Sequence, residues 1–191
     1  RQLEQYDRGR GIWRGTRFEI PADQLDSEEE WRAALADLRV PRDIDLENQW
    51  YPAVVLEVGS NDARIGIEGV EDDEDGHWIP AKDVQWARKR LDDGSLGRKA
   101  QVAGDLLEVG EVVLVRRMTS DSDGSFIRWT LRQVPEVQGG FVAMDVHTGR
   151  VIAMQGGFSY QASVFNRATQ AKRQPGSSFK PFVYASALDS G

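Results

Sequence analysis

The 191-residue sequence contains no cysteine and only two histidines, His77 and His147. Without cysteine, the chain can form neither a disulfide framework nor a thiolate metal site. The histidines lie far apart in the sequence, which argues against a histidine-rich metal site, so we expect neither a metal nor a cofactor. The longest apolar runs, such as residues 112–115, are far shorter than the ~20 residues of a membrane-spanning helix.

A signal peptide is also missing, and the sequence starts at Arg1 rather than at a methionine. We therefore expect an internal piece of a longer protein, with any membrane anchor or targeting signal outside these residues. The hydrophobic fraction of 40% is enough for an ordinary core, which argues against global disorder.

Charge is unevenly distributed along the chain, whose net charge is −7. Residues 137–191 carry five basic and two acidic side chains, a net +3, so residues 1–136 carry a net −10. This shift predicts a domain boundary near residues 135–140. The negative balance of the first part argues against a nucleic-acid-binding surface there.

The segment DSEEEWRAALADLRVP predicts a helix. Ser27 and Glu30 form a capping-box pattern, and the acidic first turn complements the helix dipole. Apolar residues recur from Trp31 at helical spacing, and Pro41 marks the end. We expect Trp31 to be a core anchor.

Residues 1–15, by contrast, lack a sustained period and indicate an irregular linker.

Five short, partly alternating, β-branched segments follow the helix, separated by turn sequences such as GSND and SDSDG. With a short helical stretch near 83–91, they predict a small β-barrel or an open, strongly curved sheet. The run 91–105 is loop-like. The five expected strands are residues 50–58, 63–69, 77–80, 111–118 and 126–134.

Two charged clusters lie in this β-rich region. The acidic run 71–75 lacks the spaced ligands of an EF-hand loop, so we interpret it as a solvated hairpin tip. The basic trio 88–90, close to Trp86, is interpreted as a solvated helix face because the surrounding charge is negative.

The segment GGFVAMDVHTGRVIAMQGG, residues 139–157, predicts a β-hairpin. Two alternating stretches, 141–146 and 150–155, flank a turn at 147–149. Because His147 lies in that turn, we interpret it as a polar turn residue rather than a catalytic base.

The last stretch, RQPGSSFKPFVYASALDSG, predicts a helix over about 177–189. Ser177 and Lys180 then lie on one face, about one turn apart. A serine hydroxyl is a poor nucleophile until a neighbour accepts its proton, and a neutral lysine amine can do so. The free N–H of Ser177 at the helix start suits an oxyanion donor. Alone, however, this short motif favours a structural interpretation, in which serine caps the helix and Lys180 lies on the surface.

A wider context changes that balance. RATQAKRQPGSSFKPFVYASALDSG resembles the nucleophile segment of the penicillin-binding proteins, in particular the bifunctional class A group of the 1A type. The hairpin, with FNRATQA after it, resembles the opening of their transpeptidase domain. YDRGRGIWRG, residues 6–15, is similar to the segment that leads out of their glycosyltransferase half. The β-rich region then resembles, mostly by position, the OB-like domain inserted there.

This resemblance implies a mainly β fold with some α structure, in three parts. Residues 1–15 are a linker from the glycosyltransferase half, and 16–136 are an OB-like antiparallel barrel for accessory or docking roles. Residues 137–191 are the first hairpin and nucleophile helix of an α/β, serine β-lactamase-like transpeptidase domain. The family's Ser-x-Asn and Lys-Thr-Gly motifs are absent, so we expect a fragment that is inactive alone.

The resemblance also implies the chemistry. Ser177 is the nucleophile and Lys180 its proton acceptor, in a reaction that cross-links peptidoglycan stem peptides at D-Ala-D-Ala through an acyl-enzyme. β-Lactams acylate the same serine. The longer protein is expected in the periplasm, anchored in the bacterial inner membrane. An outer-membrane lipoprotein activator is the expected partner of the OB-like domain, and nucleic acid is not.

Two other hypotheses stay open. A serine β-lactamase shares the Ser-x-x-Lys logic, but the long β-rich stretch before Ser177 argues against it. A non-catalytic protein-docking module with an OB-like fold fits residues 16–136, where the alternative is a plain spacer.

Overall fold

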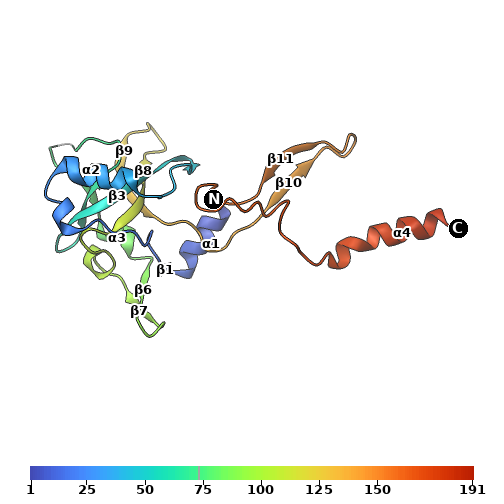
Figure 1. Ribbon diagram of the computed structural model, residues 1–191, viewed down its shortest axis with the longest axis horizontal. Coiled ribbons are helices and arrows are strands. Elements are labelled where there is room, and N and C mark those ends of the chain that lie inside the picture. Colours follow the sequence, from blue (N-terminus) through green and yellow to red (C-terminus); the bar gives the residue numbers. More distant parts are fainter. Residues whose placement is uncertain (73) are drawn as a thin grey trace.

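The structure, a computed structural model, describes residues 1–72 and 74–191. The acidic run 71–75 therefore lies partly outside the described residues. Figure 1 shows a barrel at one end, from which the hairpin β10–β11 projects, and α4 at the far end. The elements are α1 (Gln2–Arg10), β1 (Ile12–Trp13), η1 (Ala22–Gln24), α2 (Glu28–Asp37), β2 (Asp45–Leu46), β3 (Asn48–Val58), β4 (Ala63–Ile67), β5 (His77–Ile79), α3 (Ala81–Val84), β6 (Arg88–Arg90), β7 (Leu96–Lys99), η2 (Ala103–Asp105), β8 (Val112–Thr119), β9 (Phe126–Arg132), β10 (Phe141–Met144), β11 (Val151–Gln155), η3 (Gly176–Phe179) and α4 (Lys180–Asp189).

The five predicted strands are confirmed and form one antiparallel sheet in the order β5-β4-β3-β8-β9. Its two edge strands, β5 and β9, approach each other. The ring of His77 on β5 lies edge-on against the ring of Trp129 on β9, with ring centroids 5.7 Å apart. The sheet is thus a nearly closed five-stranded barrel, with α3 in the connection between β5 and β8. This is the Greek-key arrangement of an OB-like fold, and the predicted mainly β fold is confirmed.

Alternation along β3 gives the domain two apolar layers. Ala53 and Val55 point into the barrel interior, where they join side chains from β4, β8 and β9. Val54 points to the other face and packs in a second cluster with Trp31 and Leu35 of α2. Because both faces of this strand are covered, its sequence reads as a nearly continuous apolar run.

Helix α2 is predicted correctly, including its start. The Ser27 hydroxyl accepts a hydrogen bond from the N–H of Glu30 at 3.2 Å, which satisfies one donor of the first turn. Trp31 is only 3% exposed. Its ring lies so close to Gly66 of β4 that a Cβ there would be 2.7 Å from it. Trp31 is therefore the expected core anchor, and it packs on a strand that has glycine at the point of contact.

Three local predictions are wrong. The run 91–105, expected to be loop-like, contains strand β7 and the 3₁₀ turn η2. The expected irregular linker 1–15 contains the helix α1, whose Glu4 and Asp7 are buried against the barrel. The helix expected near 83–91 is short, and the basic trio forms strand β6, which pairs in parallel with β1 and antiparallel with β7. The trio is exposed as expected, although on a strand. The partners of α1 are distant in sequence, and the short, mostly exposed strands β6 and β7 show no apolar alternation, so no local periodicity reports these elements.

The C-terminal part has the predicted hairpin and helix. β10 and β11 pair antiparallel, and Asp145 accepts hydrogen bonds from the backbone of His147 and Thr148 in the turn. A 3₁₀ turn, η3, runs directly into α4. No helix among the described residues is both long and apolar enough to cross a membrane.

Candidate functional site

Ser177 and Lys180 lie where η3 becomes α4, so they share the start of one continuous helical segment. Gly176 precedes them with φ +55°, a left-handed conformation that glycine adopts easily. The N–H of Lys180 donates to the carbonyl of Ser177. The local geometry therefore places the serine hydroxyl and the lysine amine about one turn apart.

Neither side chain of the pair has a hydrogen-bond partner in the part of the chain that the structure describes. Within residues 1–72 and 74–191, no hydrogen bond involves Ser177 Oγ or Lys180 Nζ, and both residues are exposed. The segment offers a hydroxyl, an amine and an N–H at a helix start, which are the parts needed for acyl transfer. It does not by itself bury the amine or supply a second oxyanion donor.

Apolar side chains around this segment are also exposed. Phe182 and Leu188 of α4 are 69% and 84% exposed, and Ile152 of the hairpin is 71% exposed. Phe179 and Phe182 contact each other, with ring centroids 5.9 Å apart. The site residues thus stand on an uncovered surface rather than in a pocket.

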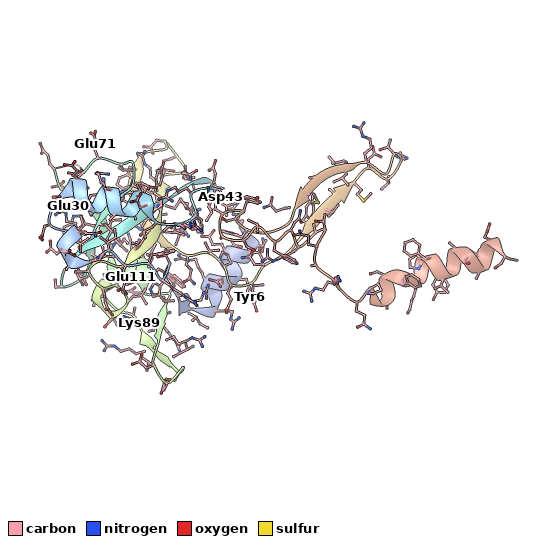
Figure 2. The ribbon with its side chains drawn as sticks, in the orientation of Figure 1. Tyr6, Glu30, Asp43, Glu71, Lys89 and Glu111 are labelled. Atoms are coloured by element: carbon pink, nitrogen blue, oxygen red, sulfur yellow. The ribbon has the colours of Figure 1, made fainter. Side chains whose placement is uncertain are left out.

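The segment after the hairpin is fastened to the barrel at Asp43, which Figure 2 shows on the barrel side nearest the hairpin. Its carboxylate accepts hydrogen bonds from Ser159 Oγ at 2.6 Å and from the N–H of Tyr160 at 2.7 Å. Partial burial opposes ionisation of Asp43, but these bonds outweigh it and lower the pKa of the carboxyl. Phe158 adds an apolar contact to Trp50, with centroids 5.5 Å apart.

A second junction forms at Asp7 of α1, which is 1% exposed. Arg14 donates to both carboxylate oxygens, at 2.6 and 2.7 Å. Gln133 donates its side-chain amide at 2.7 Å, and the N–H of Glu136 donates at 3.2 Å. Asp7 therefore joins the segment that enters the barrel to the segment that leaves it.

A cleft of about 650 Å³ lies between β6 and the barrel. It is lined by four basic and four acidic side chains around Trp13, including Lys89 and Glu111, which Figure 2 labels close together. Lys89 forms an ion pair with Glu108. Burial raises the pKa of Glu111, whose carboxylate accepts a hydrogen bond from Trp13 Nε1 at 3.2 Å. The balanced charge gives this cleft no basic groove of the kind that binds nucleic acid.

The two charged clusters noted in the sequence do not form one surface. Figure 2 shows Glu71 and Lys89 at opposite ends of the barrel. No group of His, Cys, Asp and Glu side chains suited to a metal ion occurs in the part of the chain that the structure describes.

Sequence reasoning does not find the buried charges Glu4 and Asp7 or the partly buried Glu111. Charged residues at such positions carry no apolar periodicity, so a pattern search assigns them to the surface. For Asp7, the available signal is the alternation of charge with Trp13 and three glycines in residues 6–15, a composition that is also typical of a linker.

Two family models match the chain. The model described as the penicillin-binding protein OB-like domain matches residues 13–137. The model described as the penicillin binding protein transpeptidase domain matches residues 139–191. Together they cover nearly every residue after the first helix.

Several curated relatives are named penicillin-binding protein 1A. The chain is 39% identical over 143 residues to the one from Vibrio cholerae, covering 74% of this chain and 16% of that protein. It is 36% identical over 190 residues to the one from Rickettsia typhi, covering 99% of this chain and 20% of that protein. The chain thus spans about a fifth of the length of the Rickettsia relative and a smaller share of the length of the Vibrio relative.

A solved structure is similar as well. It is the 2.6 Å crystal structure of penicillin-binding protein 1A from Haemophilus influenzae, with a TM-score of 0.65 and 28% identity, covering 99% of this chain and 24% of that one. Fold, family models and relatives agree, and the chain belongs to the penicillin-binding proteins, with the 1A type as its relatives.

Proposed function

We propose that this chain is the middle part of a bifunctional peptidoglycan synthase of the 1A type. Residues 1–15 lead out of a glycosyltransferase half, 16–136 form an OB-like accessory domain, and 137–191 begin the transpeptidase domain. The observation that carries the proposal is Ser-x-x-Lys at a helix start inside a segment that matches the transpeptidase family.

In the proposed reaction, Ser177 Oγ attacks the carbonyl carbon of a D-Ala-D-Ala bond in a stem peptide. Lys180 accepts the hydroxyl proton, and the terminal D-Ala leaves with a proton on its amine. The N–H of Ser177 stabilises the oxyanion. The acyl group then passes from the serine to the amine of another stem peptide. A β-lactam acylates the same hydroxyl, and its ring opens in place of a leaving group.

The same proposal predicts the location and the partner of the longer protein. The longer protein lies in the periplasm, with its membrane anchor in the inner membrane and outside these residues. The OB-like domain receives an outer-membrane lipoprotein activator. The negative charge of residues 1–136 fits a protein partner that is recognised through surface charge.

Labelling with a fluorescent penicillin tests the assignment. In the longer protein, we expect labelling that Ser177→Ala abolishes and Ser178→Ala, its matched neighbour, preserves. In the 191-residue chain, we expect no stable acyl-enzyme, because Ser177 and Lys180 are exposed and only one oxyanion donor is present. Labelling of the Ser177→Ala protein at the wild-type rate would show that another residue is the nucleophile.

Replacing the OB-like domain by a neutral linker tests its docking role. A docking domain predicts that the linker version no longer responds to the purified activator, whereas a spacer predicts an unchanged response. Glycan polymerisation by the same protein is the control that the rest of the molecule is folded.

A further inference from the structure

A second, smaller cavity lies between α1 and the barrel strands β8 and β9. Its volume is about 280 Å³. Its lining is rich in arginine, with four guanidinium groups against two carboxylates, so it carries a surplus of positive charge. The lining residues are Arg1, Glu4, Gln5, Arg8, Glu47, Arg116 and Arg132.

The two glutamates occupy only part of the donor capacity of these arginines. Arg132 donates to Glu4 at 2.6 Å, and Arg116 donates to Glu47 at 2.9 Å. Arg8 donates to the carbonyl of Leu131 and stacks over the ring of Trp86, and it forms no ion pair with a carboxylate among the described residues. A guanidinium carries five N–H donors, so several remain for a ligand.

Two of the remaining donors are buried. The Nε atoms of Arg116 and Arg132 are inaccessible to solvent and have no hydrogen-bond partner among residues 1–72 and 74–191. Arg132 itself is only 9% exposed. An unsatisfied buried donor on a charged group is costly. Because neither Nε atom is open to the cavity, an anion there would meet the terminal guanidinium nitrogens of these arginines instead.

Burial is the main electrostatic feature of these arginines. It lowers the pKa of Arg132 to about 10; Glu4 opposes this, and the nearby Arg116 and Arg8 add smaller effects in the same direction as burial. Burial also lowers the pKa of Arg8, where Glu4 and Asp83 oppose it and Arg116 adds to it.

We propose that this cavity binds a phosphate-type oxyanion, which bridges α1 to the barrel. The guanidinium groups come from α1 on one wall and from β8 and β9 on the other. A tetrahedral anion presents oxygen atoms to both walls, whereas a single carboxylate presents them on one side. Arginine forks suit phosphate oxygens because they donate two parallel hydrogen bonds.

Calorimetric titration of the 191-residue chain with inorganic phosphate, at constant ionic strength set with sodium chloride, is the direct test. We expect one saturable site and a thermal midpoint that rises with the logarithm of the phosphate concentration. An isotherm without saturation, together with a midpoint that phosphate moves no more than chloride does, overturns the proposal.

Three variants are expected to change the affinity for phosphate in different ways. Arg116→Gln removes one of the guanidinium groups that line the cavity and should weaken phosphate binding by about tenfold or more. Glu47→Gln removes a competing carboxylate and should tighten it. Arg117→Gln, next on the same strand but exposed, should leave it unchanged. If Arg116→Gln does not fold, Glu47→Gln still decides, because unchanged or weaker binding in that variant contradicts a site of surplus positive charge.

The source of the phosphate group is distinguished with two further probes. Equal affinity for glycerol 3-phosphate and inorganic phosphate supports a phosphate ester carried on a larger molecule. Binding of inorganic phosphate alone supports a free ion. Acetate that binds as tightly as phosphate overturns the tetrahedral assignment.

Discussion

The barrel and the C-terminal segment differ in how much of their apolar surface is buried. Every buried hydrophobic residue that the structure describes lies at or before Leu131, and within residues 136–191 only Ser159 is buried. The barrel closes around its own core, and α2 covers a second apolar layer. The hairpin and α4 instead expose apolar side chains on their surfaces.

The difference teaches where each part obtains its stability. A two-stranded hairpin is marginal in water, and so is an isolated helix of the ten residues found in α4. Their local sequences specify a hairpin and a helix, but the energy that holds them must come from packing against other protein surface. The candidate nucleophile is therefore placed on the part of the chain that depends on such cover.

The largest effect is expected at Lys180 in the longer protein. Lys180→Ala should slow penicillin acylation of Ser177 by ~10²–10⁴-fold, because the hydroxyl loses its proton acceptor. Lys172→Ala, on the preceding exposed segment, is the matched control and should change little. The labelling rate is measured on gels from samples that are quenched at successive times. A Lys180→Ala protein that is acylated as fast as the wild type would contradict the assigned role.

A matched pair of leucines measures the contrast in stability. Leu35→Ala removes a fully buried side chain from the layer under α2 and should cost ~2–5 kcal/mol of unfolding free energy. Leu188→Ala, 84% exposed in α4, should stay within about 0.5 kcal/mol. Urea denaturation of the 191-residue chain, followed by tryptophan fluorescence, gives both values. Equal losses would mean that α4 packs in solution, against the contrast drawn here.

The sequence allowed prediction of those parts of the barrel that repeat locally. Alternation placed all five strands, and Ser27 with Trp31 placed α2 and its buried face. Strand β6 could not be predicted because its three basic residues are exposed and show no apolar alternation. Buried Glu4 and Asp7 were missed because their burial is decided by partners such as Arg132 and Arg14.

The candidate site shows the same limit. Ser177 and Lys180 could be named from a short motif and its context, and the expected helix is present. Their catalytic roles stay a prediction, because neither side chain has a partner in the described part of the chain. Nothing local in the sequence encodes the walls that an active site requires.

A smaller effect is expected where the two parts meet. Asp43→Ala removes the acceptor for Ser159 Oγ and the N–H of Tyr160, so amide exchange at residues 159–161 should accelerate several-fold. Barrel amides should be unaffected, and Asp45→Ala, an exposed residue two positions on, should be silent. Hydrogen exchange measured by NMR reports each amide, and unchanged exchange at 159–161 would show that Asp43 does not hold the segment.

The smallest effect concerns Glu111 and pH. Because burial raises its pKa above the ordinary value of 4.5, the folded state holds the proton more tightly than the unfolded state. Its contribution to stability is therefore lost as the pH rises from about 4.5 through the raised pKa. Glu111→Gln should gain stability relative to the wild type as the pH rises towards neutral.

Thermal midpoints of the wild type and Glu111→Gln between pH 4 and 7 give this difference. Glu108→Gln is the contrasting control, since the hydrogen bond from Lys89 lowers the pKa of Glu108. A midpoint difference that is the same at every pH would contradict the buried-acid interpretation of Glu111.

The bonds to Asp7 have a mechanical consequence. Residues before the barrel and residues after it are hydrogen-bonded to one carboxylate, so the chain enters and leaves the barrel at the same point. A pull on α1 is then shared between residue 136 and strand β9, because Glu4 and Arg8 of α1 are also bonded to Arg132 and Leu131. The remaining barrel strands lie outside this load path and bear little of the tension between the neighbouring segments.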